Sequence, residues 1–364
     1  MKKVLSLLLV LTAALSFVGC SNSEEIPEAC IGAPGRIGEE VIKVAVIKNL
    51  GNDEHAAQIL AGAIEEGESL GFEVTTMVTK DHAEFEDQFN QVLIQDYDAI
   101  FYTHAPAEKI VGLVERALEK GMVVAGFDSA ETPYTLDNVV STKQDDYEMA
   151  RLSLQALVDH IDPDGTRTTA IPILEMLVDG FGPQIARESV LTGQFIDTDL
   201  LTVSYKQGEV GDWSNVAGIN ADSIPGIISA NQEIEAIWAA WDAFATGAYT
   251  GLPNSSNPNL PIFSVDVSNA DLQKMQEEGS NWLMTAAADA KAVGIINMRM
   301  IAIMLAGGDV ESTFELPITA IYSVDLIAAG GEITVATLTD VYPTWGSSDV
   351  YLRDWMTIIK DKIQ

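Results

Sequence analysis

Short runs of β-branched and apolar residues alternate with amphipathic segments from residue 41 onward. The runs predict strands at residues 41–47, 72–78, 99–103 and 122–127. Helices are predicted between them, at residues 54–70, 81–95 and 106–120. In the last of these helices the apolar residues fall on one face, as in a helix that covers a sheet. Strands and helices alternating at this spacing predict βαβ units and a parallel sheet.

The same alternation starts again after residue 144. Helices are predicted at residues 145–160 and 184–194, with a strand at residues 168–174 between them. Further strands follow, at residues 200–205, 236–240, 262–265 and 282–286. Two α/β units in series predict two lobes, each within the usual domain size of about 100–200 residues. A cleft between two lobes is a natural ligand site.

The first twenty residues have the pattern of an export signal. Lys2 and Lys3 precede an apolar run at residues 4–18, and Gly19 follows it. A basic start, a short apolar stretch and a small residue before the cut are typical of a cleaved signal, predicted here at residues 1–19. The alternatives are a plain secretory signal or a single membrane anchor. The apolar run has 15 residues, fewer than the roughly 20 that span a bilayer.

The cysteine after Gly19 resembles that of a bacterial lipobox, although Phe17 stands where leucine is typical. This resemblance implies cleavage before Cys20 and attachment of a lipid to its sulfur. Residues 20–40 are rich in Ser, Glu, Gly and Pro and predict a flexible spacer between the lipid and the folded body. Cys30, the other cysteine, lies in that spacer, so an acylated Cys20 leaves no pair for a disulfide within the chain.

The composition excludes several classes of function. The chain has 54 acidic and 20 basic residues, and a net charge of −34 repels nucleic acid and anionic lipid. It contains no His-Glu-x-x-His motif and no phosphate-binding glycine loop, and its 4 histidines show no metal-ligand spacing. We therefore expect a binding protein rather than an enzyme, with no catalytic residues, no metal and no cofactor.

Five segments, taken in their order along the chain, together resemble one protein family. They are YDAIFYT at residues 97–103, KGMVVAGFD at 120–128, EAIWAAWDAFATGA at 235–248, IFSVD at 262–266 and TAAAD at 285–289. Each is weak alone, but together they resemble the sugar-binding proteins of bacterial ABC importers over roughly residues 42–310. The resemblance implies the type 1 periplasmic binding fold. This is an α/β fold of two Rossmann-like lobes with parallel sheets, joined by a three-strand hinge.

The resemblance also implies lobe boundaries. The N-terminal lobe would comprise residues 41–142 and 288–312, and the C-terminal lobe residues 143–287 and 313–364. The extended tail from residue 313 exceeds the minimal plan of the family, and we expect it to cover one lobe. A less favoured alternative is a lid that brings Trp345 towards the cleft.

In such folds the ligand lies at the carboxyl ends of the strands, between the lobes. In the N-terminal lobe this rule selects Asn49, Asn52, His55, His104, Asp128 and Gln144. Asp128 matches an aspartate that binds sugar hydroxyls in relatives, because a carboxylate accepts strong hydrogen bonds in a closed cleft. For His104, a solvated loop position is an equal alternative. Relatives place aromatic residues near the position of His55, so a simple pyranose fits this chain less well.

In the C-terminal lobe the same rule selects Trp241, Asp242 and Asp266, and the resemblance adds Arg187. Arg187 matches an arginine that donates to the ligand, the alternative being an exposed ion pair. Trp241 stands where relatives carry a hydrogen-bonding residue and offers a stacking surface, unless it belongs to the core. Asp266 resembles another sugar-binding aspartate, with a helix N-cap as the alternative.

The resemblance predicts an exported, lipid-anchored solute-binding protein that faces the periplasm or the cell exterior. It would capture a sugar, polyol or similar polar solute and, as a monomer, deliver it to the permease and ATPase of an ABC importer. One alternative is a co-receptor that senses an autoinducer-like or sugar signal for a membrane receptor. A glycosidase-type hydrolase is a less favoured third reading.

Overall fold

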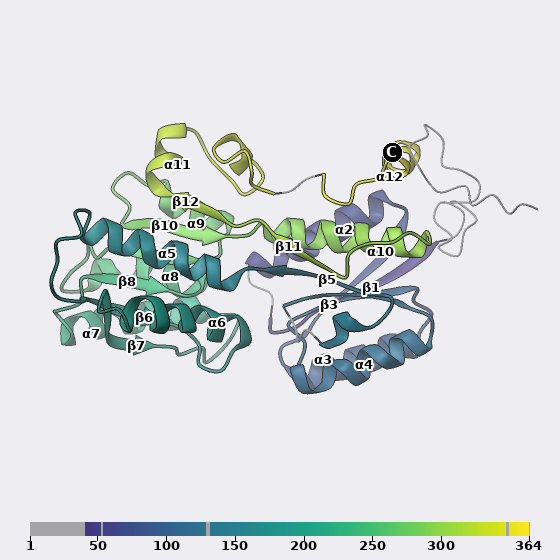
Figure 1. The fold of residues 1–364 in the computed structure, drawn as a ribbon, viewed down its shortest axis with the longest axis horizontal. Helices are drawn as coiled ribbons and strands as arrows, with labels where there is room; N and C mark the ends of the chain where they lie inside the picture. The colour runs from purple at the N-terminus through teal and green to yellow at the C-terminus, as the bar shows by residue number, and fades with distance from the viewer. Residues whose placement is uncertain (1–40, 52–53, 129–131, 347–348, 364) are drawn as a thin grey trace, which may run out of the picture.

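A computed structural model describes residues 41–51, 54–128, 132–346 and 349–363. The predicted signal, the spacer, Cys20 and Asn52 lie outside these ranges. The described chain forms two lobes, each built on a six-stranded sheet with helices packed against it (Figure 1). The predicted α/β fold with two mostly parallel sheets is therefore confirmed.

The sheet of the first lobe has the strand order β11-β5-β4-β3-β1-β2, and all neighbouring strands are parallel. Its strands are β1 (Ile42–Lys48), β2 (Phe72–Val78), β3 (Ala99–Thr103), β4 (Val123–Phe127), β5 (Val139–Gln144) and β11 (Thr313–Leu316). Both β3 and β4 are buried along their whole length. Helices cover both faces of a parallel sheet, which is why these strands read as continuous apolar runs.

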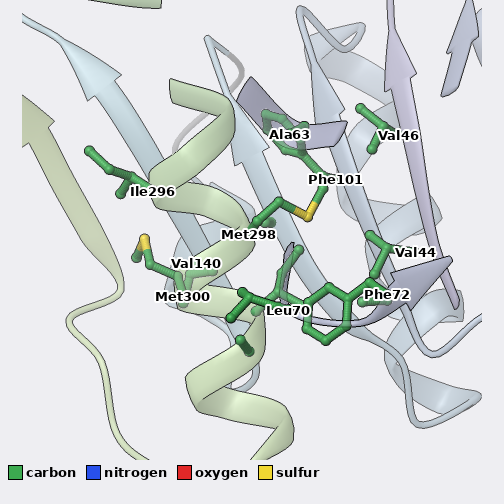
Figure 2. Close-up of a cluster of buried hydrophobic side chains, with 14 of the residues drawn as sticks. Val44, Val46, Ala63, Leu70, Phe72, Phe101, Val140, Ile296, Met298 and Met300 are labelled. Carbon is green, nitrogen blue, oxygen red and sulfur yellow. The ribbon is translucent and has the colours of Figure 1, made fainter. Parts of the chain in front are cut away.

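Helices α2 (Glu54–Ser69) and α10 (Ala290–Leu305) cover one face of this sheet. Helices α3 (His82–Leu93) and α4 (Ala107–Glu119) cover the other face. Figure 2 shows the core under α2 and α10, where strand side chains meet helix side chains such as Met298. Burial of this cluster fixes both helices to the sheet through the hydrophobic effect.

The sheet of the second lobe has the order β12-β10-β9-β8-β6-β7, with β12 antiparallel to β10 and the other pairs parallel. Its strands are β6 (Ile171–Met176), β7 (Leu201–Gln207), β8 (Ala236–Ala239), β9 (Ile262–Val265), β10 (Trp282–Ala287) and β12 (Thr319–Tyr322). Its helices are α5 (Asp146–Ile161), α6 (Gly182–Val190), α7 (Val216–Ala230), α8 (Asp242–Gly251), α9 (Asn269–Met275) and α11 (Ser323–Ala329). Short helical segments in the loops of both lobes lie at Thr132–Thr135, Leu191–Ile196, Leu252–Asn254 and Leu338–Asp340.

The chain passes between the sheets at residues 144–146, 287–290 and 316–319. The last of these differs from the expected boundary at residue 312, because β11 pairs with β5 and so belongs to the first lobe. A strand of only four residues at a sheet edge leaves too short a pattern for the sequence to indicate.

The tail is divided between the lobes rather than belonging wholly to the second. Trp345 is buried in the core of the second lobe, and its indole N–H donates to the carbonyl oxygen of Val335 at 3.1 Å. It is therefore not part of a lid over the cleft. Helix α12 (Asp354–Ile363) lies on the first lobe, where Lys360 and Arg299 both donate to Glu66, at 2.7 and 2.6 Å.

Helices α2 and α10 approach closely because glycines stand at their crossing. A Cβ atom at Gly294 would collide with the carbonyl oxygen of Ile59, and one at Gly62 would collide with that of Lys291. Because α10 starts directly after the chain has crossed from the second lobe, this crossing fixes one of the connections between lobes to the first lobe.

We expect Gly294→Ala to destabilise the protein by about 1–3 kcal/mol, the usual range for overpacking a tight contact. Gly112, in the middle of α4, is the matched control, since a Cβ atom there would meet nothing within 4 Å. Gly112→Ala should be neutral or stabilise by up to about 1 kcal/mol, because alanine favours the helix. Denaturant unfolding of both variants measures the difference, and equal stability would contradict the close crossing.

Candidate ligand-binding cleft

A cavity lies between the lobes, where the carboxyl ends of strands from the two sheets face each other. Its volume is about 50 Å³, enough for about four water molecules. It is lined by Lys48, Leu50, His55, His104, Asp128, Gln144, Phe181, Pro183, Gln184, Arg187, Trp213, Trp241 and Asp266. A site at strand ends between two lobes has the expected location for this type of fold.

The structure brings most of the predicted site residues to this cavity. Those that line it are His55, His104, Asp128, Gln144, Arg187, Trp241 and Asp266. Asn49 is buried beneath it, where its amide donates to the carbonyl oxygen of His104 and its Oδ1 accepts from Thr79. Asp242 is buried at the start of α8 and hydrogen-bonds Asp271 of α9. These last two side chains support the loops around the cleft and do not line it.

Sequence reasoning missed Lys48, Leu50, Phe181, Pro183, Gln184 and Trp213, which also line the cavity. Lys48 and Leu50 flank Asn49 at the end of β1, so the strand-end rule pointed to the turn whose neighbouring residues line the cavity. Trp213 lies between β7 and α7, and the same rule applied to β7 would have found it. Phe181 and Pro183 carry no polar group, so a search for hydrogen-bonding residues passed over them.

Arg187 of α6 holds the second-lobe side of the cavity together. Its Nε donates to Asp146 Oδ1 at 2.8 Å, and its Nη1 donates to Asp266 Oδ2 at 2.9 Å. Nη1 also donates to the carbonyl oxygen of Ala240 at 2.5 Å. Burial alone lowers the pKa of Arg187, but the two carboxylates outweigh burial and raise the pKa above its usual value. The guanidinium thus joins the start of α5 to the ends of β8 and β9.

Burial also shifts the acid and the imidazole on the first-lobe side. It raises the pKa of Asp128 well above its usual value, and the nearby Asp146 raises it further. It lowers the pKa of His104 well below its usual value, with Lys48 adding to the effect. His104 Nε2 lies 3.6 Å from Asp128 Oδ2, which is beyond hydrogen-bond distance. Both shifts favour neutral groups that gain from hydrogen bonds to a polar solute.

Backbone strain is concentrated at this cavity. Four of its residues that are not glycine have positive φ angles: Leu50 at 62°, His104 at 53°, Asp128 at 48° and Asp266 at 70°. His104, Asp128 and Asp266 come directly after β3, β4 and β9. A left-handed conformation is uncommon for such residues and costs free energy. Here it turns the chain sharply at the strand end, where the side chain faces the cleft.

Aromatic rings form a continuous row along the cavity. His104 and Phe181 are nearly parallel, with an interplanar angle of 7° and centroids 6.1 Å apart. Phe181 and Trp213 have centroids 5.9 Å apart, and so do Trp213 and Trp241. The row starts in the first lobe at His104 and continues through three rings of the second lobe. The cleft therefore combines charged groups with a large apolar surface.

Comparison with known proteins identifies the family. The periplasmic binding protein domain family matches residues 44–309. The chain belongs to this family. This periplasmic binding protein is 31% identical to the sugar ABC transporter protein of Yersinia enterocolitica subsp. enterocolitica 8081, with a TM-score of 0.82 over 89% of this chain and 96% of that chain. No curated protein sequence matches it.

More distant structures share the fold. A solute-binding protein of a 5-methylthioribose transporter from Thermotoga lettingae TMO has 23% identity and a TM-score of 0.78, over 88% of this chain and 99% of that chain. A Mycobacterium smegmatis protein in complex with β-D-fucofuranose has 14% identity and a TM-score of 0.72, over 84% of this chain and 98% of that chain. The fold of this periplasmic binding protein is thus one that solute-binding proteins use.

The binding protein is in a closed arrangement, with direct contacts across the cleft. The carboxylate of Glu54, at the start of α2, accepts hydrogen bonds from the backbone N–H groups of Asn269 at 2.9 Å and Ala270 at 3.3 Å. These N–H groups belong to the first residues of α9, in the second lobe. A carboxylate is favoured at a helix start, where backbone N–H groups lack partners. This contact stabilises the closed arrangement of the lobes.

The family is one of transport binding proteins rather than enzymes. One sequence pattern of hydrolases does occur, Gly-x-Ser-x-Gly at residues 67–71. Ser69 ends α2 and donates to the carbonyl oxygen of Glu66 at 2.7 Å. A nucleophile elbow needs a turn from strand to helix, and this segment leads from a helix into β2. The pattern therefore has no catalytic setting here.

Two further findings concern the described ranges. Within them, no cluster of three or more His, Cys, Asp or Glu residues is placed to hold a metal ion. None of the helices in the part of the chain that the structure describes is long and apolar enough to cross a membrane.

Proposed function

We propose that this binding protein captures a sugar or a similar polar solute between its lobes and delivers it to the permease and ATPase of an ABC importer. The relative from Yersinia enterocolitica is described as a sugar ABC transporter protein. The Thermotoga lettingae and Mycobacterium smegmatis structures contain 5-methylthioribose and β-D-fucofuranose. These relatives support a monosaccharide or a derivative of one as the solute.

The observation that carries the proposal is the convergence of polar groups from both lobes on one cavity. Asp128 comes from the first lobe, and Arg187 and Asp266 come from the second. A solute that hydrogen-bonds both sets gains contacts that the open form lacks. It therefore favours the closed form by differential affinity, and a transporter can recognise that form.

Polyhydroxy solutes suit these groups chemically. Carboxylates accept hydrogen bonds from hydroxyl groups, and the Arg187 guanidinium donates to their oxygens. In a cavity shielded from water such bonds are stronger than in solution, and any polar group left without a partner is costly. A sugar that satisfies these groups therefore gains affinity, and one with a misplaced hydroxyl loses it.

A thermal-shift screen of residues 41–364 against sugars, polyols, nucleosides and amino acids tests the proposal. A sugar at one hundred times its dissociation constant adds about 2.7 kcal/mol of stability, which raises the melting temperature by several degrees. Asp128→Asn should weaken binding of that sugar by about two- to tenfold, since an amide NH₂ replaces a carboxyl oxygen and disrupts a hydrogen bond worth about 0.5–1.5 kcal/mol. The control is Asp87→Asn on an exposed site of α3, which should bind as the wild type does.

The outcomes separate clearly. A shift with sugars alone that Asp128→Asn reduces supports the proposal. A shift with amino acids alone, or no shift with any solute, contradicts it.

The proposal extends to the amino terminus, on the sequence pattern alone. The signal at residues 1–19 is removed, Cys20 carries a lipid, and residues 20–40 tether the lobes outside the cytoplasm. Mass spectrometry of the mature protein should find an acylated Cys20 as the first residue, and Cys20→Ala should release the protein from the membrane fraction. A mature chain that starts after Cys20 and carries no lipid would contradict the tether.

A further inference from the structure

The cleft presents more aromatic surface than one sugar ring needs. Phe181, Trp213 and Trp241 line it and are all half-buried. They follow β6, β7 and β8, which are neighbours in the second sheet, so each of three adjacent strands places one ring at the same edge. Aromatic side chains bury about 150–250 Å² each, so three of them offer more surface than one small sugar ring covers. The rest of the row is apolar surface that a plain sugar leaves uncovered.

Uncovered apolar surface inside a binding cavity favours a solute that covers it. The ring centroid of Trp213 lies 5.9 Å from that of Phe181 and 5.9 Å from that of Trp241, so the row is continuous. Leu50 and Pro183 add to the apolar lining. Placing an apolar group of the solute against this surface removes both from water, and binding strengthens with the area buried.

The chemistry of the charged groups indicates that this part of the solute is uncharged. The guanidinium of Arg187 is bonded to Asp146, Asp266 and the carbonyl oxygen of Ala240. It therefore already has carboxylate partners, and an anionic substituent would compete with them. A cationic substituent would lie near Lys48 and Arg187, which also line the cavity and whose positive charges oppose it. An uncharged alkyl or thioether group meets neither cost.

The closed arrangement leaves little free space between the lobes. The cavity is about 50 Å³, room for roughly four water molecules, so a sugar requires the lobes to open somewhat. A small sugar with a short side group requires less opening than a sugar with a large aromatic base.

We infer that the solute is a small monosaccharide that carries a short, uncharged apolar substituent, and that Phe181, Trp213 and Trp241 select for this substituent. The inference rests on the proposed function and narrows it. The hydroxyls of the solute face Asp128 and Arg187, and its apolar substituent lies on the aromatic row.

Titration calorimetry on residues 41–364 with matched compounds tests the inference. The panel is D-ribose, D-xylose, D-glucose and D-galactose, their methyl glycosides, and 5-methylthioribose. Each buried methylene-sized group strengthens binding by about fourfold, so a methylthio group should add about tenfold over the parent sugar. The compound that binds most tightly should carry an apolar substituent. If an unsubstituted sugar binds most tightly, the inference is overturned while the proposed function stands. If no compound of the panel binds, the inference is overturned, and the thermal-shift screen decides the proposed function separately.

Variants locate the preference on the aromatic row. Trp213→Ala should weaken binding of the substituted sugar about tenfold. Binding of the unsubstituted parent sugar should weaken less than about threefold, because the parent does not reach this ring. Trp213→Phe should restore most of the preference. Tyr205→Ala, at an exposed aromatic of β7, is the matched control and should bind as the wild type does. If Trp213→Ala weakens both compounds equally, the row holds the sugar ring itself and the inference is wrong.

Discussion

The cleft depends on one buried ionic interaction, between Arg187 and the carboxylates of Asp146 and Asp266. Asp146 starts α5, directly after the chain has entered the second lobe, and Asp266 follows β9. Two carboxylates this near to each other and this well buried require a cation, since desolvation and mutual repulsion disfavour both charges. Arg187 supplies that cation with rigid geometry, and it also binds the carbonyl oxygen of Ala240 beside Trp241. Arg187 thus holds in place both the two carboxylates and the backbone beside Trp241.

The first lobe presents an acid and an imidazole that are not bonded to each other. Asp128 and His104 are buried, shifted towards neutrality and too far apart for a hydrogen bond. Both groups can therefore gain hydrogen bonds from a polar solute. Glu54 adds a direct bond from the first lobe to the start of α9. Closure thus combines direct contacts between the lobes with contacts through the solute.

Strand-end positions were predictable because parallel strands are continuous apolar runs and the fold brings their carboxyl ends together. That rule found Asp128 and Asp266, whereas only the resemblance singled out Arg187, which lies within a helix. It also selected Asn49, whose side chain bonds His104 and Thr79 beneath the cavity, next to the left-handed turn at Leu50. The same rule reaches Trp213 in the loop after β7, but this tryptophan resembled any other loop aromatic. The division of the tail depends on long-range pairing of β11 with β5, which no local pattern carries.

Urea unfolding of Arg187→Met at pH 7 tests the central claim most directly. Removing one partner of a buried ionic group costs about 3–5 kcal/mol, so the free energy of unfolding should fall by that amount. Burial already raises the pKa of Asp146 to about 6, and without Arg187 it rises further. A raised carboxyl pKa favours the folded state at low pH and costs stability as pH rises, so the loss should be smaller at pH 5 than at pH 7. A variant as stable as the wild type at both pH values would contradict the account.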